Sequence, residues 1–297
     1  MKKMVIVAII AIVVIVGIII SAFLWLGYIS PPSNVATLII EKGNVEINSG
    51  NSWITAKNNS QLKEKDSIRT LENSRVNIVF FESSVIRLDE NTEISLEKLD
   101  ETKRSIQLLQ NSGTTWNKVL KLSGVSSYEI QTPSAIATVR GTSFAINVKG
   151  NETNISLVNG SLQVNSYELI ENKDRKMEKK YIATETMVEK ESAWIGKGSR
   201  EIKKMPLKGN NWIEENQIKD RRFIVEKADN LIEKYRNIIN IAKSRNNLSD
   251  EQIRQYVIGY VEGRYTIKKA IEEGIISESD MGLMPEELKR SEGIGTE

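Results

Sequence analysis

An uninterrupted apolar run near the N-terminus constrains this chain more than any other feature. Residues Met4–Ile29 contain no charged side chain, and about 20 apolar residues of helix are enough to span the core of a bilayer. A cleaved signal peptide has a shorter apolar segment of about 7–15 residues, and Ala22-Phe23-Leu24 is a poor cleavage site. We therefore expect a transmembrane anchor whose partner is the lipid bilayer.

The basic residues around this run predict its orientation. Lys2 and Lys3 precede it, and the first basic residue after it is Lys42. Positive charge near a membrane span favours the cytoplasmic side. We therefore expect residues 1–3 to be cytoplasmic and the protein to cross the plasma membrane once. A short proline-containing linker at residues 30–35 then leads to a bulk that lies outside the cytoplasm.

The chain lacks two residue types on which much enzyme chemistry depends, because it contains no cysteine and no histidine. Thiolate chemistry, disulfides and Ser-His-Asp or Cys-His nucleophiles are therefore excluded. The ligands of most zinc, copper and haem sites are missing as well. The formal net charge of +2 gives no reason to expect nucleic acid as a partner. We expect a protein that is not an enzyme and that has no metal and no cofactor.

Short runs of alternating apolar and polar residues predict a mainly β domain over residues 36–205. Alternation with a period of two turns one face of each strand inward. Two hairpins of similar pattern are predicted at residues 78–86 and 155–163, the second because Asn159-Gly160 suits a tight hairpin turn.

The stretch Gly43–Ile47 is similar to Gly160–Val164, which suggests a degenerate internal repeat. No fixed period is clear enough to predict a solenoid. The expected fold is therefore a set of compact stacked β-hairpins, arranged as a sandwich or a β-roll.

The pattern changes to a helical period after a predicted linker at residues 206–211. One stripe of apolar residues recurs every three or four positions; it contains Ile224, Ala228, Leu231, Tyr235, Ile238 and Ala242. Ser249 to Gln252 has the form of a capping box that starts a second helix. A third helix is expected from about Thr266 to Glu273, before Gly274. We assign residues 212–297 to a small helical domain with a frayed tail.

One segment in the β domain contains a distinctive set of residues, namely Thr132, Pro133, Val139, Arg140, Gly141, Thr142 and Phe144, followed further on by the closing pair Asn159 and Gly160. This set resembles the core motif of the FecR-domain family. The flanking segments 66–70 and 81–88 are similar to other steps of the family pattern, with Lys65 and Ser83 where glycine is common. The resemblance covers about Leu38 to Val164.

The resemblance implies an all-β domain outside the cytoplasm that senses or binds a partner. In the best-known members a cytoplasmic segment contacts an extracytoplasmic-function sigma factor, and the β domain contacts an outer-membrane transporter. Here the expected cytoplasmic part is only residues 1–3, and the C-terminal helices are not part of the family pattern. Both departures favour a binding module over the complete signalling scheme.

Three functions are compatible with these features. The leading hypothesis is a membrane-anchored FecR-like interaction or sensor module that binds a protein or an envelope polymer, with C-terminal helices that bind another partner or self-associate. The first alternative is a FecR-type signalling regulator that relays through a partner in the membrane. The second is an envelope hydrolase with two catalytic carboxylates, although no sequence pattern indicates such a pair.

Several residues allow two interpretations. Arg140 is able to bind a carboxylate or phosphate, or to tie loops together beside a glycine with an unusual backbone angle. The motif residues as a set are expected to be structural. Four tryptophans suit either a ligand-stacking surface or internal packing; they are Trp53, Trp116, Trp194 and Trp212. Three acidic residues near Asn91 suit either calcium or a solvated turn; they are Asp89, Glu90 and Glu93.

Overall fold

The computed structural model describes residues 36–50, 52–81, 84–120, 125–139, 141–172, 174–277 and 280. The predicted anchor at Met4–Ile29 lies outside these residues, as does Arg140. Among the described residues, no helix combines the length and the apolar character needed to cross a membrane. The described part belongs to a compact unit, Val35–Glu297.

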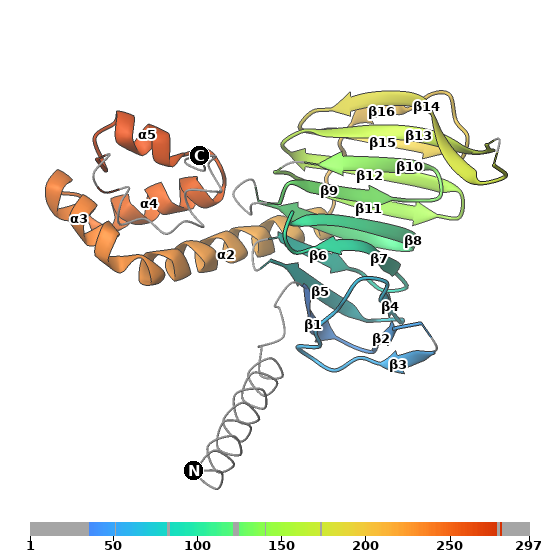
Figure 1. Ribbon diagram of the computed structural model, residues 1–297, viewed down its shortest axis with the longest axis horizontal. Coiled ribbons are helices and arrows are strands. Elements are labelled where there is room, and N and C mark those ends of the chain that lie inside the picture. Colours follow the sequence, from blue (N-terminus) through green and yellow to red (C-terminus); the bar gives the residue numbers. More distant parts are fainter. Residues whose placement is uncertain are drawn as a thin grey trace, which may run out of the picture. The chain divides into compact units, whose positions relative to one another are not determined.

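Two β-sheets face each other and enclose the main core, which confirms the expected mainly β fold (Figure 1). Sheet A has the strand order β1-β5-β6-β8-β11-β12-β15-β16. Sheet B has the order β3-β2-β4-β7-β8-β9-β10-β13-β14. Neighbouring strands are antiparallel, except that β8 and β9 are parallel.

The bounds of the strands in sheet A alone are β1 Ala36–Lys42, β5 Arg75–Phe80, β6 Ser84–Leu88, β11 Ser143–Lys149, β12 Glu152–Asn159, β15 Glu191–Gly196 and β16 Lys203–Pro206. Those in sheet B alone are β2 Val45–Asn48, β3 Trp53–Thr55, β4 Ser67–Thr70, β7 Glu93–Asp100, β9 Ser127–Gln131, β10 Ala135–Val139, β13 Leu162–Glu171 and β14 Met177–Met187. The long strand β8, Ser105–Val119, belongs to both sheets.

Side-chain alternation explains why these segments form half-buried strands. In β5, Val76, Ile78 and Phe80 are fully buried while the residues between them are partly exposed. The predicted hairpin at residues 78–86 is confirmed, because Ile78 pairs with Ile86. In β6 every residue is buried. Both faces of β6 are therefore covered, whereas a strand with one face in solvent alternates between buried and exposed residues.

Glycines with positive φ mark three places where the chain passes from one sheet to the other. Gly43 lies between β1 and β2, Gly113 lies within β8, and Gly160 lies between β12 and β13. At each of them an added Cβ atom would come within 3.0 Å of the side chain of a serine or threonine on a neighbouring segment. The similarity between Gly43–Ile47 and Gly160–Val164 thus reflects the same structural step, in which a glycine corner starts a strand of sheet B.

The predicted hairpin at residues 155–163 is wrong. Strand β12 pairs with β11 and β15, whereas β13 pairs with β10 and β14, so the two strands lie in opposite sheets. A two-residue hairpin turn of the kind that Asn-Gly favours needs φ > 0 at both central residues. Here Gly160 has φ of 92°, but Asn159 is not among the residues with positive φ. The pair forms a corner between sheets instead.

Four helices follow the strands in the described part of the chain. They are α2 Asn211–Lys234, α3 Arg236–Asn246, α4 Asp250–Val261 and α5 Ile267–Glu272. Helix α2 begins inside the predicted linker, where the Asn210 side chain accepts a hydrogen bond from the Ile213 N–H (2.9 Å). The capping box of Ser249 and Gln252 is confirmed. The apolar stripe predicted a single helix. It instead spans two helices, α2 and α3, because the helix is interrupted at Tyr235.

Candidate functional site

The first part of the FecR-like motif forms a buried turn between β9 and β10. The hydroxyl of Thr132 lies 2.7 Å from that of Thr153, and Ser134 Oγ donates to the Ile195 carbonyl (3.0 Å). Pro133 lies between them in the turn and is half-buried. Because Thr153 and Ile195 belong to sheet A, the Thr-Pro turn fastens sheet B to sheet A.

The middle of the motif contributes to the core. Val139 is the last residue of β10, where it pairs with Leu162, and Phe144 on β11 is fully buried and pairs with Leu157. Arg140, the residue with the most distinctive binding chemistry in the motif, lies outside the described residues.

The end of the motif forms the glycine corner. A Cβ atom on Gly160 would lie 2.7 Å from Thr142 Cγ2 and 2.8 Å from the Gly141 carbonyl oxygen. The Asn159 side-chain amide (3.0 Å) and the Gly160 N–H (3.1 Å) both donate to the Glu189 carboxylate. Thr142 Oγ1 is buried with no hydrogen-bond partner among the described residues. The described motif residues therefore lie in a turn, the core and a corner, and not together on one exposed surface.

A different set of residues forms the strongest polar cluster, at the junction between sheet A and helix α2. Arg87 on β6 donates to Asp220 on α2 (2.5 Å), and the Trp116 indole on β8 donates to the same carboxylate at 3.1 Å from each oxygen. The side chains of Arg87 and Asp220 are 8% and 7% exposed. A charged pair this deeply buried needs such matched partners, because desolvation of an unpaired charge costs several kcal/mol.

The strand and helix patterns did not predict this junction, although the sequence carries a signal for it. Arg87 lies among Val85, Ile86 and Leu88 on β6, a strand in which every residue is buried. Asp220 falls in the helical stripe of Ile213, Asn216, Ile224 and Ala228, which are the other buried positions of α2. A charged residue at a core position in two separate elements is rare unless the charges are paired. The two together would have predicted a contact between β domain and helix.

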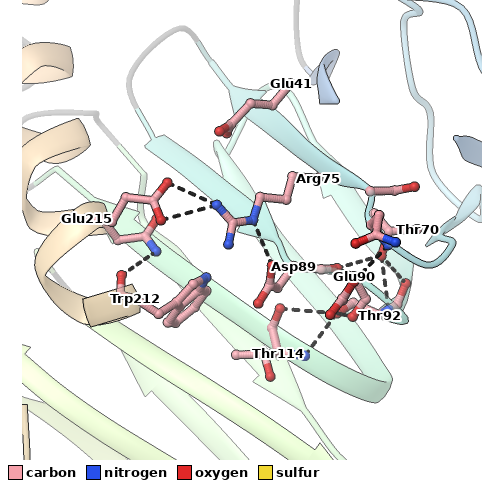
Figure 2. Close-up of polar contacts among 12 residues, drawn as sticks. Glu41, Thr70, Arg75, Asp89, Glu90, Thr92, Thr114, Trp212 and Glu215 are labelled. Atoms are coloured by element: carbon pink, nitrogen blue, oxygen red, sulfur yellow. Dashed lines mark hydrogen bonds and ion pairs between the residues drawn. The ribbon is translucent and has the colours of Figure 1, made fainter. Parts of the chain in front are cut away.

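A second group of charges lies at the edge of the junction (Figure 2). Arg75 on β5 donates through Nη1 to both Glu215 oxygens, at 3.0 and 3.1 Å, and through Nε to Asp89 at 2.8 Å. Lys219 bonds to Glu41 on β1 at 2.6 Å and to Glu215 at 2.9 Å. Hydrogen bonding to Lys219, with a further contribution from Arg75, lowers the pKa of the Glu215 carboxyl.

Apolar contacts complete the junction. Trp116 and Trp212 meet edge to face with their ring centroids 6.0 Å apart, and Ile213 packs into the same cluster. Further along the helix, Leu120, which directly follows β8, packs against Ile224 and its neighbours. Two of the four tryptophans thus pack internally at this junction, and they are not available to stack on a ligand.

Among the described residues, no carboxylate is in hydrogen-bond contact with the Lys118 ammonium. Lys118 on β8 is half-buried, and its ammonium donates to Ser143 Oγ at 3.0 Å. Burial lowers the pKa of Lys118, although the Asp220 and Glu262 carboxylates oppose that effect. Lys118 therefore adds positive charge near Arg87, where the Asp220 and Glu262 carboxylates interact with it.

The acidic residues considered for calcium are engaged in other contacts. Asp89 pairs with Arg75 as described above, Glu90 accepts from the Asn73 N–H (2.7 Å), and Glu93 accepts from the Asn111 amide (2.9 Å). Across the described residues, no group of three or more acidic side chains is arranged to hold a metal ion.

The helical region contains an apolar cavity of about 140 Å³. Its lining comes from α2, α3, α4 and α5 and includes Leu231, Ile238, Ile253, Tyr256, Tyr260 and Ile267. No polar atom contributes to its surface. Such a site suits only apolar groups, since a polar group placed there would lose its hydrogen bonds to water.

Comparisons with known proteins agree with the motif. Residues 66–163 match the model of the family described as FecR protein. No curated protein matches the chain. Two solved structures, at 2.50 and 1.65 Å resolution, are titled as a "putative anti-sigma factor" from Parabacteroides distasonis ATCC 8503. Each has 15% identity, covers 48% of this chain and 59% of the other, and gives a TM-score of 0.37. A likeness of this extent carries no functional argument.

Proposed function

Because residues 66–163 form a FecR domain, we propose that this chain is a FecR-type signalling regulator that acts by binding and has no catalytic role. The observation that carries the proposal beyond the family match is the buried junction of Arg87, Trp116 and Asp220. It couples the FecR domain to a helical region that is not part of the family pattern.

The junction supports regulation because it is costly to open partway. Separating Arg87 from Asp220 leaves a buried charge unpaired, which costs about 3–5 kcal/mol. The side-chain contacts of sheet A with α2 are therefore expected to form or break together. A partner that binds the FecR domain and favours one arrangement of sheet A thereby changes the binding properties of the helices, and the reverse holds by linkage.

The proposed location follows from the sequence. Met4–Ile29 anchors the chain in the plasma membrane, and the FecR domain and helices lie outside the cytoplasm. The partner of the FecR domain is a protein or an envelope polymer, and the signal passes through a partner in the membrane. Alkaline phosphatase fused after Glu297 is active only outside the cytoplasm, so an inactive but stable fusion would contradict this orientation.

The second candidate is a binding module that does not signal. The burial of the junction favours it, since a helix fixed to the sheet by a buried ion pair also makes a rigid binding surface. The two candidates share the FecR domain and differ in whether the junction has to move.

Gene deletion with complementation separates the two candidates. For a regulator, deletion in the native host changes the transcript level of a defined gene set, and the wild-type chain restores it. Asp220→Asn keeps an acceptor for Trp116 but weakens the ion pair, so we expect it to alter this regulation even when its protein level is matched to that of the wild-type chain. An unchanged transcriptome after deletion, together with loss of cell-surface binding, would identify the non-signalling module.

A further inference from the structure

The hairpin of β13 and β14 extends beyond the body of sheet B. Strand β10 pairs with β13 only from Leu162 to Ser166. From Tyr167 to Glu171, β13 pairs with β14 alone, over Met177 to Tyr181. We call the described residues 167–172 and 174–181 the arm. A two-stranded ribbon of this kind is marginally stable in water without further packing.

The arm exposes large apolar side chains. Leu169 is 53% exposed, Met177 is 61% exposed and Tyr181 is 56% exposed. The register pairs Tyr167 with Tyr181, Leu169 with Lys179 and Glu171 with Met177, which places these apolar side chains on one face of the arm. Several exposed apolar residues gathered on one face indicate an interaction surface.

The outer edge of β14 is open along the arm. Among the described residues, β14 pairs only with β13. Near its other end the Lys204 ammonium bonds to the Thr186 carbonyl (3.2 Å) and lies 3.6 Å from Glu185, so that part of the edge is partly covered. A register shift next to Tyr167 separates the two parts. Unpaired N–H and C=O groups on an edge strand are a template for another strand.

We propose that this edge binds the same edge of a second copy of the chain, as antiparallel strands related by a twofold axis at Lys179. In that register Met177 faces Tyr181 of the second copy, and Glu178 faces Lys180 of the second copy. Each pair occurs twice because a twofold interface is isologous. Opposite charges and apolar residues placed directly across antiparallel strands are favourable pairs.

Charges on the arm fit this arrangement. Lys180 lies 3.8 Å from Glu168 on the neighbouring strand, so the pairing would place it between Glu168 and Glu178 of the second copy. Lys179 would face its own counterpart, but its ammonium is bonded to Gln131 and lies 5.9 Å from the centre of the Tyr167 ring. Both contacts direct it toward β9 and β13, and away from the axis.

Cysteine crosslinking tests the register directly, because the natural chain has no cysteine. Residues paired across antiparallel strands have Cβ atoms about 4.5–5.5 Å apart, so mild oxidation of full-length Lys179→Cys in isolated membranes is expected to give a disulfide-linked dimer. The matched control is Ile54→Cys, because Ile54 lies on the edge strand β3 and is 61% exposed. A dimer yield for Lys179→Cys no higher than for this control would overturn the proposal.

Charge reversal provides the second test. Glu178→Lys or Lys180→Glu alone places like charges across the interface twice, so each is expected to weaken dimerisation about tenfold. The double variant restores opposite charges and is expected to recover most of the dimer. Crosslinking yield in the Lys179→Cys background measures all three. If the double variant is as monomeric as the single ones, the proposed pairing is wrong, since loss of the contacts that Glu178 and Lys180 make within the arm, with Asn172 and Glu168, would explain that result.

Discussion

At the scale of single residues, a few buried polar and glycine positions determine how the two parts of the molecule meet. Asp220 serves both Arg87 and the Trp116 indole, so one carboxylate satisfies two buried donors from different strands. Gly160 allows two segments to approach more closely than any side chain would permit. These positions are sensitive to substitution for different physical reasons, and two predictions follow from that difference.

The first prediction concerns the buried ion pair. Asp220→Ala leaves the Arg87 charge buried without a partner, so the free energy of unfolding should fall by about 3–5 kcal/mol. The double variant Arg87→Met/Asp220→Leu removes both charges and should unfold at nearly the wild-type urea concentration. Urea titration followed by tryptophan fluorescence measures both. Equal destabilisation by the two variants would show that packing, and not the unpaired charge, dominates at this junction.

The second prediction concerns the glycine corner. Gly160→Ala adds a Cβ atom 2.7 Å from Thr142 Cγ2 at a positive φ, and should lower the free energy of unfolding by about 2–4 kcal/mol. Gly150→Ala is the matched control, because it also has a positive φ but has no atom within 4 Å of the added Cβ. It should cost only about 1–2 kcal/mol from the backbone. Equal losses in thermal unfolding would contradict the close-contact explanation.

At the scale of elements, α2 and β8 carry most of the connections. Helix α2 buries one stripe against sheet A and against α4, and its edge holds Glu215 and Lys219 over β1 and β5. Strand β8 belongs to sheet B before Gly113 and to sheet A after it. Displacing either element would therefore change more than one interface at once.

The third prediction is that the docking of α2 weakens in acid. The pKa of Glu215 is lowered below its usual 4.5 by Lys219 and Arg75. A carboxyl with a depressed pKa contributes stability above its unfolded pKa, and that contribution is lost as the pH falls through the folded value. After correction for the pH dependence of the intrinsic rates, hydrogen exchange of the α2 amides should therefore become faster as the pH falls from about 5 to 3. This is roughly the range in which carboxylates titrate.

The matched control for acid sensitivity is Glu215→Gln. It should show faster α2 exchange already at neutral pH, and a smaller further increase in acid, because one titrating group is absent. All other carboxylates are the same in the two proteins, so their contribution cancels in the comparison. An identical acid response in the two proteins would assign the effect to those other carboxylates.

At the scale of the whole molecule, the β domain and the helical region are linked within the compact unit Val35–Glu297. The fourth prediction is that a fragment of residues 35–297 unfolds in one calorimetric transition, because buried charge and apolar contacts join its two regions. Asp220→Ala should separate this into two transitions, with the helical region melting first, since its apolar clusters are smaller than the sandwich core. Two transitions in the wild type would mean that the junction does not couple the regions.

Local features of the fold were predictable from the sequence. Period-two alternation identified strands such as β5, and the capping box at Ser249 identified the start of α4. Gly274 also follows α5 as expected. Each of these depends on interactions within a few residues, so neighbours in the sequence contain the information. The membrane anchor at Met4–Ile29 rests on the same kind of argument and stays a prediction.

Contacts between distant segments were decided only by the tertiary structure. Asn159-Gly160 predicted a hairpin because its local chemistry suits one, but the approach of Gly141 and Thr142 turned it into a corner between sheets. Asp220 and Arg87 meet although they are far apart in the chain. The sequence by itself determined strand, helix and cap, which are local choices. The pairing of β12 and β13 with other strands, and the docking of α2, depend on packing and on desolvation of charge, which exist only once the sheets have assembled.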